Sequence, residues 1–278
     1  MNKCAITIGI ITYNEENNIL KFFDSLKSQH LADKLVITEV IFVDDSNDET
    51  PNLINKIKSE NPKFNISLIH NDKRKGASQA WNTIFRNAKG SIIILLDADI
   101  EIGEKCISRL SNKISDNVGL CASNTIPKIN SRSLYTCASI FISYWLRSIR
   151  MNGLSQYTTM GRALALNTEL AKGIEIPQEI IAIDLYLQCK VLEMNKRVIY
   201  DDDAIIYFNP PVTKHDFFSQ VVRALIGHGQ IKEFFKNSIK YPKGSLCLLL
   251  CYLQLPVSYF KDREQVSYMW ETANSTKN

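Results

Sequence analysis

The first hundred residues alternate between short apolar runs and longer amphipathic stretches. Each run is continuously hydrophobic, as expected for a strand covered on both faces of a sheet. The runs are Ala5–Ile11, Val36–Val43, Phe64–Ile69 and Ile92–Leu96. Between these runs, apolar residues have helical spacing over Asn18–Leu26, Pro51–Ile57 and Ala77–Ala88. For the second of these stretches, Thr50 is the expected N-cap and Pro51 the first helical residue. This alternation predicts an α/β fold with a mostly parallel central sheet flanked by helices.

The second half of the chain has a less regular pattern. It predicts helices over Leu134–Ile149 and Glu179–Glu193, and a short strand over Gly161–Leu166. A strand over Lys196–Ile206 is interrupted by a turn at Asp201–Asp203, and a helix over Asp216–Phe235 is broken near Gly227-His228-Gly229. No linker separates two folding units, so we expect residues 1–235 to form one domain with a helical C-terminal part.

Polar residues follow each of the four apolar runs of the first half. They are Thr12–Glu15, Asp44–Asp48, Asn71–Gly76 and Asp97–Asp99. In doubly wound sheets, ligands bind beyond the carboxyl ends of the strands. The pattern therefore predicts a binding site, rich in carboxylates, at this edge of the sheet.

Composition excludes several classes of protein. With 278 residues, 45% hydrophobic and 22% charged, the chain is neither disordered nor a small disulfide scaffold. The formal net charge of +4 is too small to indicate nucleic acid, but it suits an anionic ligand or a membrane surface. Seven cysteines without a metal-ligand spacing are typical of reduced thiols in a cytoplasmic protein.

Asp97-Ala98-Asp99 is the strongest candidate for chemistry. Two carboxylates at the end of a buried strand can hold a hard divalent cation, Mg²⁺ or Mn²⁺, which keeps open positions for phosphate oxygens and water. Such a cation neutralises charge on a diphosphate leaving group. The similar Asp201–Asp203 has no comparable apolar strand before it, so we interpret it as a turn.

The motifs together resemble the family 2 glycosyltransferases, whose fold is the nucleotide-binding GT-A fold. The resemblance rests on Ile11–Glu15, Val43–Ser46, Gly76–Asn82 and Leu96–Asp99, followed by Ile183–Tyr186 at the acidic motif of the family. Gln220–Ala224 resembles the QxxRW motif of the cellulose, chitin and hyaluronan synthase branch. The resemblance covers about residues 4 to 230, and the order and spacing of the motifs make it specific.

The resemblance implies a role for each donor-side residue. Thr12, Tyr13, Asn14, Glu15 and Asp45 would hold the base and ribose of a UDP- or GDP-linked sugar, with Tyr13 stacking near the base. Asp99, supported by Asp97, would bind the metal that bridges the diphosphate. The basic loop Lys73–Lys75 is either a phosphate contact or a solvated loop, and we assign Lys75 to the nucleotide sugar.

On the acceptor side, the resemblance makes Asp184 the general base that deprotonates the acceptor hydroxyl in an inverting transfer. Gln220 and Arg223 lie three residues apart, on one face of a helix, and would close over the diphosphate or the acceptor. Ala224 replaces the tryptophan of the QxxRW branch, which argues against a processive polymer synthase. We interpret His70, His215 and His228 as loop or packing residues.

The resemblance thus predicts a metal-dependent hexosyltransferase that acts on a glycan, lipid-linked or other hydroxyl acceptor. Two alternatives remain: transfer onto a polyprenyl phosphate, as in dolichyl-phosphate mannose synthases, and a non-catalytic nucleotide-sugar-binding protein. Residues 1–100 would bind the nucleotide sugar and residues 101–235 the acceptor. The tail 236–278 carries an apolar run, Leu246–Leu255, too short to span a bilayer, which predicts a core helix or a peripheral contact with the cytoplasmic face of a membrane.

Overall fold

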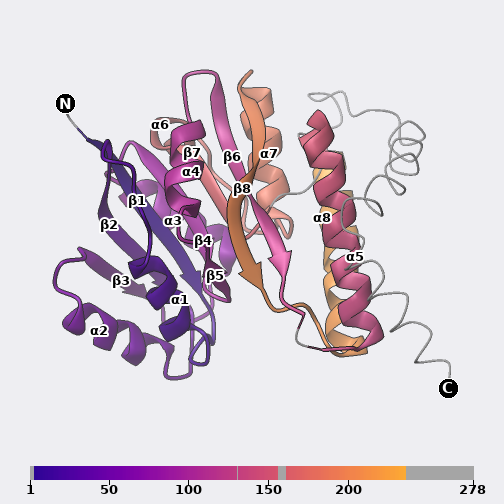
Figure 1. Cartoon of the computed structure of the whole chain (residues 1–278), viewed down its shortest axis with the longest axis horizontal. Coiled ribbons are helices and arrows are strands. Elements are labelled where there is room, and N and C mark those ends of the chain that lie inside the picture. The colour runs from indigo at the N-terminus through magenta and orange to yellow at the C-terminus, as the bar shows by residue number, and fades with distance from the viewer. Residues whose placement is uncertain (1–2, 130, 156–160, 236–278) are drawn as a thin grey trace.

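The computed structural model describes residues 3–129, 131–155 and 161–235, in which an eight-stranded sheet has the order β3-β2-β1-β4-β7-β6-β8-β5 (Figure 1). The strands are β1 (Cys4–Thr12), β2 (Leu35–Asp44), β3 (Ile66–His70), β4 (Ile92–Asp97), β5 (Ile100–Ile102), β6 (Val118–Pro127), β7 (Ala163–Asn167) and β8 (Arg197–Phe208). The helices are α1 (Ile19–Lys27), α2 (Thr50–Glu60), α3 (Ala77–Asn87), α4 (Cys106–Lys113), α5 (Leu134–Ile149), α6 (Thr168–Lys172), α7 (Ile183–Glu193) and α8 (Lys214–Phe234), with a π-helical turn, η1 (Arg150–Leu154), after α5.

The first half of the sheet is parallel, as the sequence predicts. Strands β3, β2, β1 and β4 pair in parallel, so their carboxyl ends lie at one edge of the sheet. The register places Thr12 beside Asp44, and Ile11 beside Asp97. The polar segments after these strands are therefore neighbours in space. This confirms the expected parallel arrangement of the four strands.

The second half of the sheet is mixed. Strand β7 runs antiparallel to both β4 and β6, β8 runs parallel to β6, and β5 runs antiparallel to β8. The sequence pattern missed β5, α4, β6 and α6. Strand β6 was missed because small and polar residues such as Gly119, Ser123 and Asn124 interrupt its apolar pattern, although most of the strand is buried.

Helices cover both faces of the sheet and enclose two hydrophobic cores. On one face, α1, α2 and α4 bury large side chains such as Phe22, Ile54 and Leu110. On the other face, α3 and α7 pack through residues such as Trp81 and Leu187. The continuous apolar strands between them contribute residues to both cores, which explains why β1 and β4 lack a hydrophobic–polar alternation.

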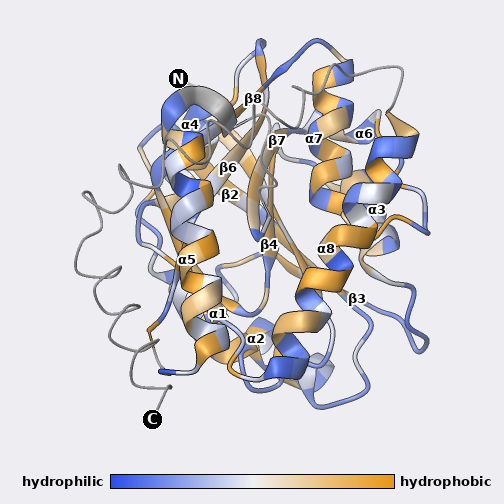
Figure 2. Cartoon of the chain, turned by 90° about the vertical axis from the view of Figure 1, so that its right-hand side faces the viewer, coloured by the Kyte–Doolittle hydropathy of each residue, from blue (hydrophilic) through white to orange (hydrophobic). Residues whose placement is uncertain are grey.

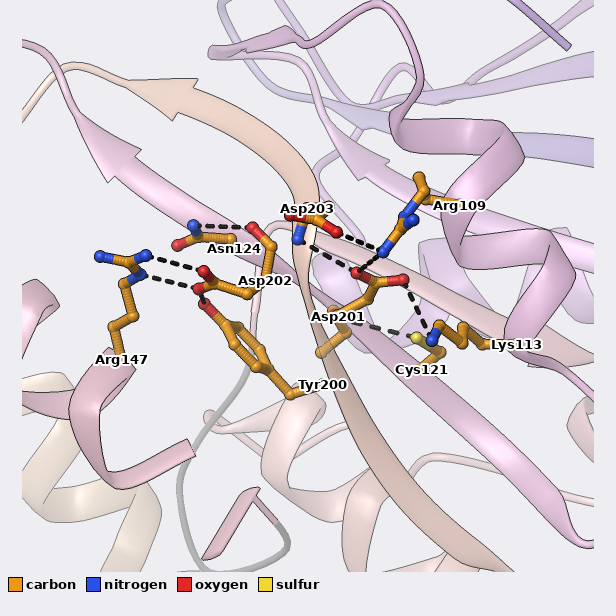
Figure 3. A network of polar contacts seen from close by, with 10 residues as sticks. Arg109, Lys113, Cys121, Asn124, Arg147, Tyr200, Asp201, Asp202 and Asp203 are labelled. Atoms are coloured by element: carbon orange, nitrogen blue, oxygen red, sulfur yellow. Dashed lines mark hydrogen bonds and ion pairs between the residues drawn. The ribbon is translucent and has the colours of Figure 1, made fainter. Parts of the chain in front are cut away.

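The turn expected at Asp201–Asp203 is wrong, because these residues lie within β8. The strand accommodates them by a register shift against β6 between Ser123 and Asn124. Basic side chains pair with all three carboxylates in an ion-pair network, in which Arg109 bridges Asp201 and Asp203 (Figure 3). Arg109 Nη2 lies 2.8 Å from an Asp201 oxygen, and the Arg147 guanidinium makes two contacts of 2.7 Å with Asp202. This second D-x-D motif therefore braces α4 and α5 against the sheet.

The expected break near Gly227-His228-Gly229 is also wrong, because α8 continues without interruption to Phe234. Gly227 serves the close approach of α8 to the segment that precedes α7. A Cβ atom on Gly227 would lie 2.6 Å from the Cβ atom of Ala182. Helix packing thus overrides the low helix propensity of glycine at this position.

Within the described residues, no helix is both long enough and apolar enough to cross a membrane. The tail 236–278, including the apolar run Leu246–Leu255, lies outside the described residues, and its role stays a prediction. The domain boundaries expected above stay predictions as well.

We expect Gly227→Ala to destabilise the protein by about 1–3 kcal/mol, because the added methyl group forces α8 away from Ala182. Gly229→Ala is the matched control: a Cβ atom there meets no atom within 4 Å, so the better helix former should leave stability unchanged or raise it. Urea unfolding of both variants measures the difference, and equal effects would contradict this role of Gly227.

Candidate active site

Asp44, the last residue of β2, joins the strand ends of the parallel sheet. Its carboxylate is fully buried, and it accepts a hydrogen bond of 2.6 Å from the Thr12 hydroxyl. Its second oxygen lies 2.7 Å from Nδ1 of His70, at the end of β3. His70 is therefore a partner of Asp44 at a strand end rather than a loop residue. This carboxylate ties three neighbouring strand ends together.

The loop that follows β1 is tied to the loop that follows β2. The backbone N–H of Asn14, whose φ is +56°, donates to the Ser46 hydroxyl at 2.8 Å. The backbone N–H of Glu15 donates to the hydroxyl of Thr50 at 2.8 Å. Thr50 is the first residue of α2 rather than its N-cap, because the N-cap position belongs to Glu49. These contacts fix the conformation of the predicted nucleotide-binding segment.

Asp45 organises the loop that follows β3. Its carboxylate accepts hydrogen bonds of 2.9 Å from the Asn71 side chain, 2.8 Å from the Lys75 backbone N–H and 2.7 Å from the Gly76 backbone N–H. Gly76 has a φ of +85°, in the region that favours glycine, and it precedes the first residue of α3. The Asp45 carboxylate thus holds the turn into α3 against the sheet.

These loops surround a first cavity of about 210 Å³. Tyr13 lines it and is 41% exposed, with the Arg74 guanidinium 3.9 Å from the centre of its ring. Arg74 lines the cavity, whereas the contact described for Lys75 is the backbone N–H that bonds Asp45. From the sequence we assign Lys75 to the nucleotide sugar. The sequence does not show which of the three adjacent basic residues lines the cavity, because this depends on the conformation of the loop.

A second cavity, of about 430 Å³, adjoins the first, and Asp97 and Asp99 line both. It brings together every acceptor-side residue predicted from the sequence: Asp184, Gln220 and Arg223. His228 also lines it, so our interpretation of this histidine as a loop or packing residue is wrong. A lone histidine beside two glycines gave no signal of this position.

Arg162 is a site residue that sequence reasoning missed. Its Nη1 lies 3.1 Å and 3.0 Å from the two carboxylate oxygens of Asp99, and its guanidinium lies 4.5 Å from the centre of the Phe208 ring. The backbone is in the left-handed region, with a φ of +71°. Such strain in a residue other than glycine is typical of functional sites. Its carbonyl accepts a hydrogen bond from the Asp97 backbone N–H, which fixes Arg162 beside β4.

Negative charge concentrates where the two cavities meet. Burial and the neighbouring Asp99 raise the pKa of Asp97 to about 7, against the opposing effect of Arg162. Burial also raises the pKa of Glu15, against a hydrogen bond from the Asn18 side chain. Adding a cation at this point would relieve the repulsion between the carboxylates.

Asp184 lies in the first turn of α7, where the positive end of the helix dipole favours a carboxylate. Burial nevertheless raises its pKa, and this effect exceeds the opposing hydrogen bonds from the backbone N–H groups of Leu185 and of Asp184 itself. The electrostatic attraction of His228 opposes the shift as well. Gly161 approaches closely: a Cβ atom there would lie 3.0 Å from an Asp184 oxygen. The arrangement therefore provides a partly desolvated carboxylate that faces a cavity.

A protein-family model described as "Glycosyl transferase family 2" matches residues 7–163, more than half of the chain. The chain belongs to this family. The match includes Asp45, Asp97 and Asp99, and it ends just after Arg162. Asp184 and the residues of α8 lie beyond it, so the geometry alone joins them to the site.

Two curated relatives of this family 2 glycosyltransferase match shorter segments. A dolichol-phosphate mannosyltransferase of Pyrococcus furiosus is 28% identical over 113 residues, which are 40% of this chain and 30% of the relative. The E. coli protein WfaP, a UDP-Glc:alpha-D-GlcNAc-diphosphoundecaprenol beta-1,3-glucosyltransferase, is 37% identical over 95 residues, 34% of this chain and 35% of the relative. The matched segment spans about a third of the length of each relative.

Two solved structures share the fold. The mannosyltransferase PcManGT from Pyrobaculum calidifontis, in complex with GDP-Man and Mn²⁺, has a TM-score of 0.62 at 19% identity, over 98% of this chain and 87% of that one. Residues 1–349 of S. aureus TarS, in complex with UDP-GlcNAc, have a TM-score of 0.57 at 18% identity, over 86% and 74% of the two chains. The GT-A fold expected for this family 2 glycosyltransferase is confirmed.

We expect Asp184→Asn to raise the melting temperature at neutral pH, because the pKa of Asp184 in the folded protein is raised. The folded state then binds a proton more tightly than the unfolded chain, so the ionised carboxylate destabilises the native protein above the folded pKa. The gain should fade as pH falls through the folded pKa, and vanish below the unfolded value. Thermal melts between pH 4 and 8 test this, with Asp72→Asn, an exposed aspartate, as control. A gain that does not depend on pH would refute the assignment.

Proposed function

We propose that this chain is an inverting glycosyltransferase that moves a sugar from a UDP- or GDP-linked donor to an acceptor hydroxyl. One observation carries the proposal: Asp97 and Asp99 form a wall shared by two cavities, one bounded by the loops after β1, β2 and β3 and the other by Asp184. A donor diphosphate and an acceptor can therefore meet at one pair of carboxylates. Relatives named for GDP-Man, UDP-GlcNAc and UDP-Glc support a nucleotide-sugar donor.

The first cavity is the proposed donor site. The exposed ring of Tyr13 offers a face on which a base can stack once Arg74 moves aside. Asp45 accepts three hydrogen bonds from its own loop, and a carboxylate has about four lone-pair sites. This leaves it capacity to accept one more from a uracil or guanine N–H group.

Asp99, with Asp97 in support, is the proposed ligand pair for Mg²⁺ or Mn²⁺. Carboxylate oxygens suit these hard cations. Burial, together with repulsion from Asp99, raises the pKa of Asp97, which fits a site completed by positive charge. Within the described ranges, no group of three or more Asp, Glu, His or Cys side chains is arranged to hold a metal ion. Two carboxylates would leave coordination positions open on such a cation for diphosphate oxygens and water. The metal would neutralise charge on the leaving diphosphate.

In the proposed transfer step, Asp184 accepts the proton of the acceptor hydroxyl. The acceptor hydroxyl oxygen bonds to the anomeric carbon while the bond from that carbon to the diphosphate oxygen breaks. The hydroxyl proton passes to the Asp184 carboxylate, and the nucleoside diphosphate leaves with the bonding electrons. The raised pKa of Asp184 brings this carboxylate closer to the working pH, which suits a general base.

A second candidate is transfer onto a polyprenyl phosphate. Arg162 and Arg223 line the second cavity, which is the proposed acceptor cavity, and can pair with a phosphate group there. One relative is a dolichol-phosphate mannosyltransferase. A phosphate oxygen is already ionised at neutral pH, so this reaction needs no general base. Either acceptor fits a protein in the cytoplasm that contacts the cytoplasmic face of the membrane peripherally, which is the location that we propose.

We expect UDP, GDP or one of their sugars to raise the melting temperature, and Mn²⁺ to increase this gain, since ligands stabilise the state that they bind. Asp99→Asn should lose the part of the gain that depends on Mn²⁺.

We expect Asp184→Asn to keep the gain in melting temperature from nucleotide and Mn²⁺. The variant should lower turnover by a factor of about 10² to 10⁴, the usual contribution of a general base. Near-normal turnover of Asp184→Asn would favour a phosphate acceptor. Nucleotide binding without transfer or donor hydrolysis by the wild-type protein would reduce the chain to a binding protein.

We expect Arg162→Met to destabilise the metal-free protein by about 1 kcal/mol, because Asp99 loses the cation of a partly exposed ion pair. Mn²⁺ should then raise the melting temperature of this variant more than that of the wild-type protein, since the metal no longer competes with a guanidinium. Arg86→Met, on the exposed side of α3, is the control. Equal gains from Mn²⁺ in wild type and Arg162→Met would show that Arg162 does not compete with the metal.

A further inference from the structure

Helix α8 carries an apolar surface that adjoins the acceptor cavity. This surface is a shallow cavity of about 690 Å³, lined by Lys214, His215, Phe218, Ser219, Val222 and Arg223. Phe218 is 50% exposed and Val222 is 49% exposed, one turn apart on the same side of the helix. Apolar residues recur along α8 (Figure 2). Its first turn contacts the first turn of α5, where the ring centres of Phe217 and Tyr135 lie 5.9 Å apart. Exposed apolar surface next to a reaction site indicates an interaction.

Arg223 connects this surface to the chemistry, because it lines both the apolar cavity and the acceptor cavity that holds Asp184. Its side chain is exposed, and no hydrogen bond or ion pair joins it to another residue that the structure describes. A guanidinium in this position can bind a phosphate through two parallel N–H donors.

The permanently charged side chains that line the apolar cavity are basic: Lys214 and Arg223. His215 also lines it, and its Nδ1 atom lies 3.6 Å from a carboxylate oxygen of Asp216, which does not line the cavity. The Lys214 Nζ atom lies 5.8 Å from the centre of the Phe218 ring, so positive charge and apolar surface occur side by side. A neutral hydrocarbon would use only the apolar part of this surface, and a soluble anion would use only the charges. An anionic amphiphile would use both.

We propose that the acceptor is a lipid-linked sugar whose phosphate or diphosphate joins the sugar to a hydrocarbon chain. This inference rests on the proposed function and specifies its acceptor. The sugar hydroxyl lies at Asp184, the phosphate binds Arg223, and the hydrocarbon chain lies along Phe218 and Val222. In this arrangement the phosphate is a handle at the mouth of the acceptor cavity, whereas transfer onto a polyprenyl phosphate would place it at Asp184 as the nucleophile.

Calorimetric titration of the full chain with geranylgeranyl diphosphate, below its micelle concentration and without divalent metal, tests the proposal. The matched probes are inorganic diphosphate, which lacks the hydrocarbon, and geranylgeraniol, which lacks the charge. We expect the amphiphile to bind at least about tenfold more tightly than either, since anchoring by the guanidinium and burial of the chain act together. Omitting the metal prevents the diphosphate from binding through Asp97 and Asp99.

Substitutions on α8 locate the binding surface. Arg223→Gln should weaken binding of the amphiphile by about tenfold, and Lys232→Gln, a charge on the same helix that lines neither cavity, should change it less than twofold. Phe218→Ser should weaken the amphiphile and leave inorganic diphosphate unaffected. Its control is Leu225→Ser, which removes a side chain that is 69% exposed outside the apolar cavity. Melting temperatures verify that each variant is folded.

Four results would overturn the inference. Failure of the amphiphile to bind would show that this face does not hold a lipid-linked phosphate. Equal affinity for inorganic diphosphate would indicate a soluble anionic acceptor, and equal affinity for geranylgeraniol would indicate a plain lipid contact. Equal losses in Phe218→Ser and Leu225→Ser would indicate nonspecific adsorption. If a nucleotide with Mn²⁺ still raises the melting temperature in these cases, the inference fails while the proposed function stands.

Discussion

The site depends on the repulsion between carboxylates that the fold brings together at the centre of the sheet edge. Asp97 ends β4 and Asp99 follows it, and the pairing of β4 with β1 and β7 places them where the first and second cavities meet. In the folded chain, the guanidinium of Arg162 pairs with Asp99 and lowers the cost of this charge. Such a site favours any ligand that brings positive charge with it. In the proposed function, this constraint links metal, donor and acceptor to one pair of side chains.

The two halves of the sheet contribute to this arrangement in different ways. The parallel half converges its strand ends, and the buried Asp44 locks three of those ends together through Thr12, Ser46 and His70. In the mixed half, ion pairs join β8 to two helices (Figure 3). Asp201 pairs with Arg109 of α4, and Asp202 pairs with Arg147 of α5. Two aspartate motifs of similar sequence therefore have different roles, because Asp97 and Asp99 line two cavities, whereas the ion pairs of Asp201–Asp203 join the sheet to helices.

Helix α8 lies between the acceptor cavity and an exposed apolar surface, and it contributes residues to both. One side contributes Gln220, Arg223 and His228 to the acceptor cavity, and Gly227 allows the helix to approach the segment before α7. The other side leaves Phe218 and Val222 exposed. A helix that only filled the core would bury its apolar residues, whereas only Gly227 and Ile231 are buried within this one. Its composition suits a contact with a ligand better than a role in the core.

Local sequence determined the parallel half of this protein: continuous apolar runs became β1 to β4, and the polar residues at their ends had to meet at one edge, because parallel strands share a direction. The family motifs marked Asp45, Asp97, Asp99 and Asp184, each beside a recognisable element. Tertiary structure decided the rest. It extended α8 through two glycines because packing against Ala182 outweighed their low helix propensity. It also kept Asp201–Asp203 in a strand, because two arginines distant in sequence, Arg109 and Arg147, pair with the three carboxylates. It also brought Arg162 and His228 to the site, since their partners are distant in sequence and no local pattern encodes such a contact.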